Sequence, residues 1–93
     1  MNTLAHNVMT RGYAHEAETS DAVAQWGLIA LRAMQRVTDN GGPDMIVGEP
    51  GGQAERLEDD GRTRIIPVPA SAPRLYACMN ETGGCTLMLA EEY

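Results

Sequence analysis

Lysine is absent from this chain of 93 residues: all seven basic residues are arginine, against 13 acidic residues, which gives a net charge of −6. Binding to a phosphate backbone is driven by cationic side chains that release counterions, so direct nucleic-acid binding is not expected. A Walker-type phosphate loop is excluded too, because no G-x-x-x-x-G-K-[ST] pattern occurs. The negative charge suits a protein partner with a basic surface, and it equally suits a small protein that must stay soluble.

Phenylalanine is also absent. One Trp and three Tyr are the only aromatic residues, whereas six Met are present. Methionine fills irregular gaps without fixing one packing arrangement, which favours a compact protein with an adaptable surface over a rigid enzyme. The length of 93 residues predicts a single domain, residues 1–93.

Long apolar runs are absent as well. The longest, "WGLIAL", is too short to span a bilayer, so no membrane association is expected. The N-terminal stretch "MNTLAHNVMTRGYAHE" lacks the basic and apolar regions of a signal peptide. These features predict a cytoplasmic protein, and a structural disulfide is not expected in that compartment.

One helix is the clearest element in the chain. The run "ETSDAVAQWGLIALRAMQRVTDNGG" predicts a helix over residues 20–38, capped by Thr19 or Ser20. Gly27 lies within its apolar face, where it indicates close approach of the helix to a sheet, and Leu28 points out among polar neighbours. At helical spacing, the apolar face consists of Ala22, Val23, Trp26, Ile29, Ala30, Ala33, Met34 and Val37.

The remaining segments predict strands. A strand is expected at residues 8–17, with further strands at about 44–48, 62–68, 74–80 and 85–91 and a long acidic loop at 49–61. Pro67 and Pro69 cannot donate to a ladder, so their strand lies at an edge or leaves the sheet there. The predicted fold is α+β: one helix packed on a small antiparallel β-sheet, in the order β-α-β-β-β with a possible extra strand.

Both cysteines of the chain lie in "CMNETGGC", residues 78–85, which fits a β-hairpin in two registers. If Cys78 faced Cys85, apolar side chains would be mixed over both faces. If Met79 faces Cys85, one face gathers an apolar set, and Gly83 takes the left-handed position of a three-residue loop. We predict the second register, which puts the two sulfur atoms on opposite faces and disfavours a disulfide. That apolar set is Leu75, Ala77, Met79, Cys85, Leu87 and Leu89.

Neither a metal site nor a catalytic site is predicted. The cysteines (C-x6-C) and the two histidines, His6 and His15 (H-x8-H), do not have the spacing of zinc ligands. The acids of "LEDD" lack the spacing of a twelve-residue calcium loop, so a solvated acidic loop is expected. His15 stands beside Glu16 and Glu18 without a nucleophile partner in the sequence. We expect no cofactor, no metal and no enzymatic activity.

The run "YAHEAETSDAVAQWGLIALRAM" resembles the strand-then-helix opening that is common in small phage-encoded accessory proteins. The whole chain is similar in format to anti-CRISPR proteins, which are short, acidic, single-domain and without catalytic motifs. The resemblance is one of architecture over most of the chain, and it transfers no functional residue. It implies a protein of the host bacterial cytoplasm that binds a defence protein and blocks it.

Nine residues are the candidates for partner binding. The acidic candidates are Glu55, Glu58, Asp59, Asp60, Glu91 and Glu92, and the apolar anchors are Leu28, Tyr76 and Met88. The leading hypothesis is a non-catalytic inhibitor, monomeric or dimeric, that binds a protein complex at its basic nucleic-acid-binding surface. The alternative is a small phage structural or accessory protein that acts as a homo-oligomer through its open sheet face; a small enzyme ranks third. On that open face we expect Tyr76, Cys78, Thr86 and Met88.

Overall fold

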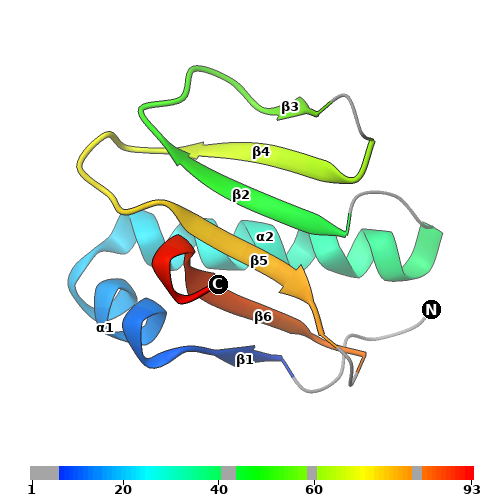
Figure 1. Cartoon of the computed structure of the whole chain (residues 1–93), viewed down its shortest axis with the longest axis horizontal. Coiled ribbons are helices and arrows are strands. Elements are labelled where there is room, and N and C mark those ends of the chain that lie inside the picture. Colours follow the sequence, from blue (N-terminus) through cyan, green and yellow to red (C-terminus); the bar gives the residue numbers. More distant parts are fainter. Residues whose placement is uncertain (1–6, 41–43, 59–60, 81–82) are drawn as a thin grey trace.

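Two helices and a six-stranded mixed sheet make up the described part of the chain, an α+β fold (Figure 1). The computed structural model describes residues 7–40, 44–58, 61–80 and 83–93, with the backbone alone for 37–40. Along the chain the elements are β1 (Val8–Met9), α1 (Arg11–Thr19), α2 (Asp21–Asn40), β2 (Met45–Pro50), β3 (Arg56–Leu57), β4 (Thr63–Val68), β5 (Leu75–Met79), β6 (Cys85–Leu89) and the 3-10 turn η1 (Ala90–Glu92).

The predicted strand at 8–17 is wrong beyond its first residues, because the chain turns into helix α1 after β1. The Thr10 side chain caps this helix by accepting a hydrogen bond from the backbone amide of Tyr13, at 3.2 Å. Tyr13 and Ala17, four residues apart, both pack on the core, and this spacing is helical rather than strand-like. A two-residue strand and a pair of helices therefore stand where one long strand and one helix were predicted.

Helix α2 lies where the sequence predicts a helix. Ser20 Oγ accepts from the amide of Val23 at 3.3 Å, which confirms one of the two predicted caps. Five residues of the predicted apolar face are buried, Ala22 is half-buried and Ile29 is 45% exposed, while the side chain of Val37 lies outside the described residues. Leu28, which was predicted to point out, is 56% exposed. The buried residues of this face are Val23, Trp26, Ala30, Ala33 and Met34.

The prediction of an antiparallel sheet is wrong in two places. The strand order is β1-β6-β5-β2-β4-β3, and β1 runs parallel to β6 while β2 runs parallel to β4. Parallel neighbours need a crossover of about a dozen residues or more, and residues 51–62 provide one between β2 and β4. The predicted acidic loop, residues 49–61, overlaps this segment, but its first two residues belong to β2 and it contains β3, which pairs antiparallel with β4.

Pro67 lies inside β4 and has no backbone N–H, but at its position no strand of the described sheet pairs with β4 on the β3 side. Strand β3 pairs only with Arg64 and Ile65 of β4, so at Pro67 the described part of the sheet continues only toward β2, where Glu49 is its partner. The predicted edge position therefore holds locally, although β4 as a whole lies between two strands.

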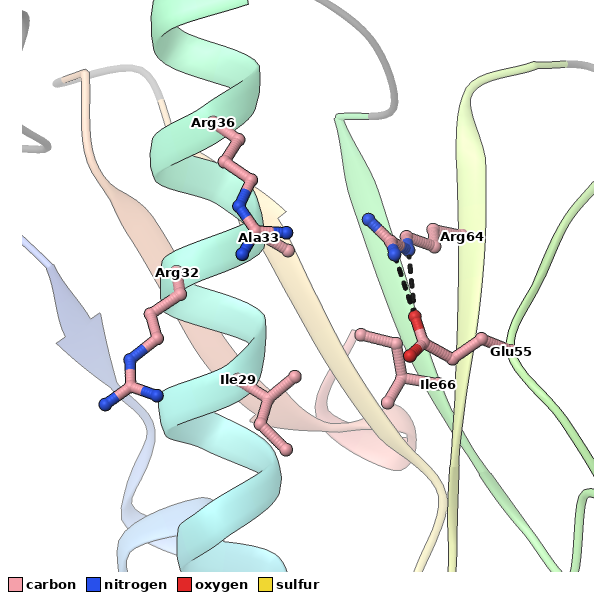
Figure 2. Close-up of a pocket in the computed structure, with 7 residues that line it drawn as sticks. All are labelled: Ile29, Arg32, Ala33, Arg36, Glu55, Arg64 and Ile66. Carbon is pink, nitrogen blue, oxygen red and sulfur yellow. Dashed lines mark hydrogen bonds and ion pairs between the residues drawn. The ribbon is translucent and has the colours of Figure 1, made fainter.

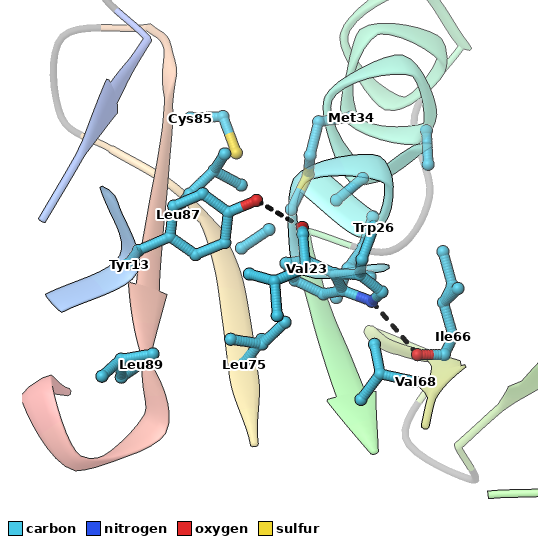
Figure 3. Packing of buried hydrophobic residues seen from close by; sticks show 14 residues of the cluster. Tyr13, Val23, Trp26, Met34, Ile66, Val68, Leu75, Cys85, Leu87 and Leu89 are labelled. Atoms are coloured by element: carbon cyan, nitrogen blue, oxygen red, sulfur yellow. Dashed lines mark hydrogen bonds between the residues drawn. The ribbon is translucent and has the colours of Figure 1, made fainter. Parts of the chain in front are cut away.

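The core fills the space between the two helices and one face of the sheet (Figure 3). Its polar groups are satisfied: Trp26 Nε1 donates to the carbonyl of Ile66 at 3.1 Å, and the Tyr13 hydroxyl donates to the carbonyl of Val23 at 2.8 Å. Gly27 makes close approach possible, as predicted, but the nearest group is the Tyr13 hydroxyl of α1, with Leu87 of the sheet further away.

The hairpin of β5 and β6 has the predicted register, with Met79 opposite Cys85. Cys85 is fully buried on the helix side, whereas Cys78 is half-buried on the other face, and both thiols are free. Gly83 has a φ of 84°, so the left-handed residue is confirmed. Residues 81 and 82 of the predicted loop lie outside the described residues.

Candidate functional site

The sheet face turned away from α2 carries a row of apolar side chains across four strands. The register places Ile65 of β4 beside Val47 of β2, Val47 beside Tyr76 of β5, and Tyr76 beside Met88 of β6. None of these four residues belongs to the core cluster, because side chains alternate between the two faces along a strand. We call this row the open-face row.

The C-terminal turn lies next to the open-face row. Figure 1 shows η1 and the chain end on the near side of the sheet, with α2 behind it. The ring of Tyr93 meets that of Tyr76 edge-on, with centroids 5.4 Å apart and an interplanar angle of 85°. Val47 and Ile65 are buried, but Tyr76 and Met88 are half-buried and Tyr93 is 78% exposed. The accessible part of this face is therefore aromatic and apolar and consists of Tyr76, Met88 and Tyr93, and among the described elements no helix covers it.

A charged cluster borders this surface on the side of β3. Arg56 Nη1 pairs with Glu49 at 2.8 Å, and Arg56 Nη2 lies 3.7 Å from Glu58. The hydrogen bond from Arg56 is the main cause that lowers the pKa of Glu49, and the same bond raises the pKa of Arg56. Exposed pairs of this kind add little stability, but they orient the side chains at the border of the row.

The predicted acidic cluster is partly paired within the chain. Glu55 lies 2.8 Å from Arg64, and Glu58 shares Arg56 with Glu49; Asp59 and Asp60 lie outside the described residues. Residues 44–64 contain six acids and three arginines, so this segment still carries half of the net charge of −6.

The two predicted acids at the C-terminal end differ from each other. The Glu92 carboxylate accepts hydrogen bonds from Thr10 Oγ1, from the amide of Gly12 at 3.2 Å and from the amide of Leu89 at 2.9 Å. The Thr10 hydroxyl, followed by the Leu89 amide, lowers the pKa of Glu92. Glu92 thus ties the start of α1 to the chain end, whereas Glu91 is exposed.

The nine predicted residues do not form one patch. Tyr76 and Met88 are direct cross-strand partners, but Leu28 projects from α2, which covers the other face of the sheet. Glu55 and Glu58 flank β3 at one edge of the sheet, whereas η1, which carries Glu91 and Glu92, follows β6 near the opposite edge.

Sequence reasoning missed three members of the open face. Val47, Ile65 and Tyr93 were not predicted, although alternation in "MIVGEP" and "TRIIPV" indicates that each strand has two apolar faces.

The thiols do not have the properties of catalytic nucleophiles. Burial raises the pKa of Cys78, and it raises the pKa of Cys85 to about 11, so neither favours the reactive thiolate. Among the described residues, no three His, Cys, Asp or Glu side chains gather to hold a metal ion. Within the same residues, no helix has the length and apolar character needed to cross a membrane.

Comparison of the chain with protein-family models, with curated proteins and with solved structures gives no match.

Proposed function

We propose that this protein is a non-catalytic inhibitor that binds a protein partner with a basic surface. The observation that carries the proposal is the open-face row, in which buried Val47 and Ile65 lead to the half-buried Tyr76 and Met88 beside exposed Tyr93, with acids at the border. Partly exposed aromatic and apolar side chains with a charged border are typical of a protein-binding surface.

The two parts of this surface have different roles in the proposal. Tyr76, Met88 and Tyr93 are the anchors, because large, partly exposed side chains near the centre of an interface contribute most of the binding energy. Segment 44–64 has a net negative charge and contains Glu58, Asp59 and Asp60, which were predicted to bind the partner. Its charge accelerates association with surfaces rich in arginine and lysine. Such surfaces hold nucleic acid in bacterial defence complexes, the target class that the anti-CRISPR format implies.

The test begins with capture of the partner from a bacterial lysate, followed by affinity measurements with the purified partner. The Tyr76→Ala/Met88→Ala variant should lose most of the affinity, while Leu28→Ala, a matched control on the opposite side, should bind like the parent protein. Unchanged affinity of the double variant would refute the role of the open face.

The acidic part is tested separately. Reversal of Glu58, Asp59 and Asp60 to Lys should slow association and flatten its dependence on salt, because screening acts on exposed charges. If affinity and its salt dependence both stay unchanged, the acidic segment has no role in binding.

A second candidate, a small phage structural or accessory protein, uses self-association. It is favoured by edge strand β1, where Val8 and Met9 are 52% and 55% exposed and can pair with another chain. Light scattering separates the two: a tight dimer at micromolar concentration favours the homo-oligomer, and a monomer favours the inhibitor.

A further inference from the structure

A groove of about 240 Å³ lies between α2 and β4, on the side of the molecule away from the open-face row (Figure 2). Its apolar lining comes from Ile29 and Ala33 of the helix and Ile66 of the strand. Ile29 is 45% exposed, although it belongs to the apolar face of α2, so the groove leaves a branched aliphatic side chain uncovered. This apolar wall lies beside a larger set of charged side chains, so the groove offers contacts for both an apolar and a charged part of a ligand.

Three arginines line the same groove. Arg32 and Arg36 lie one turn apart on α2, and Arg64 projects from β4 toward the helix, whereas the guanidinium of Arg32 is directed away from β4 (Figure 2). Among the described side chains, neither Arg32 nor Arg36 has a carboxylate within ion-pair distance. Among the described lining residues Glu55 is the one acid, so the lining has a formal charge of +2 with Arg32 counted and +1 without it, in a chain of net charge −6.

Arg64 already holds a carboxylate in this groove. Its Nη2 and Nε atoms donate to the same oxygen of Glu55, at 2.8 and 3.2 Å. The guanidinium group is planar and its donors match a carboxylate, so this pair shows which chemistry the groove recognises. Glu55 comes from an exposed segment before β3, and half of its side chain is accessible, so an incoming anion can replace it.

We propose that this arginine groove is a binding site for a small organic carboxylate. The hydrocarbon part packs on Ile29, Ala33 and Ile66, and the carboxylate is held by Arg36 and, once Glu55 is displaced, by Arg64. The volume restricts the ligand to about the size of a single ring or a short branched chain. The site is separate from the open-face row, because Arg64 and Ile66 alternate with Ile65 of the row along β4 and face α2. It shares Glu55 and Arg64 with segment 44–64, the acidic part of the proposed protein-binding surface.

The experiment is a nitrogen-15 NMR titration of the whole chain at constant ionic strength, with benzoate as the probe. Benzyl alcohol supplies the ring without the charge, and inorganic phosphate supplies the charge without the ring. Amides of residues 29–36 and 64–66 should shift and saturate with benzoate, and both other probes should bind at least several-fold more weakly.

Substitution of three exposed residues, one at a time, distinguishes specific binding in the groove from nonspecific attraction of anions. Arg36→Gln should weaken benzoate binding about tenfold, the effect of one charge-assisted hydrogen bond. Glu55→Gln should strengthen it several-fold, because the internal competitor is removed. Arg74→Gln, which changes the net charge equally but lies outside the groove, should bind like the parent chain.

The proposal is overturned by shifts that do not saturate, by shifts outside the groove, or by equal losses in the Arg36 and Arg74 variants. Weaker binding by the Glu55 variant overturns the displacement step.

Discussion

Gly27→Ala should destabilise the protein, although it places a better helix former in the middle of α2. On propensity alone the substitution stabilises an exposed helix position by about 1 kcal/mol. Gly27 is not exposed, however. A Cβ atom there would overlap the hydroxyl oxygen of Tyr13 and would lie 3.0 Å from its Cζ atom. Tyr13 is itself only 2% exposed, so it has no free space to move into.

The magnitude follows from two costs. Insertion of a methyl group into a packed core costs about 1–3 kcal/mol. Displacement of the Tyr13 hydroxyl also breaks its 2.8 Å bond to the Val23 carbonyl, and loss of a buried hydrogen bond costs about 1–3 kcal/mol. After the gain in propensity is set against these costs, we expect a net loss of about 3 kcal/mol of unfolding free energy.

The assay is urea unfolding followed by Trp26 fluorescence, with the midpoint and slope compared between variants. Tyr13→Phe removes the overlapping oxygen, so the cost of Gly27→Ala should fall by about 2 kcal/mol in that background. The remaining neighbour, Leu87 Cδ1 at 3.2 Å, is the end of a flexible side chain. A stabilised Gly27→Ala protein, or the same cost in both backgrounds, would refute the packing argument.

Two further predictions concern the hairpin and the chain end. A thiol probe should label Cys78 in the native protein and Cys85 only after unfolding, because Cys85 is buried. Equal labelling rates would contradict the register. Cys85→Ser should lower the unfolding free energy, measured by urea unfolding, by about 1–2 kcal/mol, because it buries a hydroxyl group. The pKa of Glu92 is lowered below its ordinary value of 4.5, so its contribution is present above that value and is lost as the pH falls through the folded-state pKa. Glu92→Gln should therefore lower the melting temperature at pH 7 and reduce its fall as the pH drops below the ordinary pKa of 4.5. Glu91→Gln should match the parent chain, and identical pH curves for the two variants would argue against the cap.

The parts of the fold that sequence reasoning predicted are those fixed by local pattern. Helix α2 follows from apolar spacing and a serine cap, and both features lie within one continuous segment. The register of β5 and β6 follows from matching two apolar faces across a short turn, since a slip by one residue would expose Leu87 and Cys85.

The errors come from pairings between distant segments. Residues 11–19 contain Tyr13, Ala14 and Ala17 among polar residues, and a short segment of this kind fits either alternation or a helix. What selects the helix is contact with α2 and the hydrogen bonds from Thr10 and Gly12 to Glu92, which lies 80 residues or more away. The parallel pairing of β2 with β4 likewise depends on the path of residues 51–62, which no local pattern specifies.

At the candidate site too, contacts between distant segments, which the sequence pattern does not reveal, decide which charged groups are paired within the chain. Composition gives the sign of the net charge, and "ERLEDD" gives the position of the densest acids, but neither tells which acids the chain itself neutralises. Glu55 is held by Arg64, from a strand that follows it in the chain, and Glu92 is held by the start of α1. An acid that already has a partner must lose that partner before it can bind another surface, so its contribution to binding is smaller than its exposure implies. For this reason the apolar row with Tyr76, rather than the acidic cluster, is the stronger basis for the proposed docking surface.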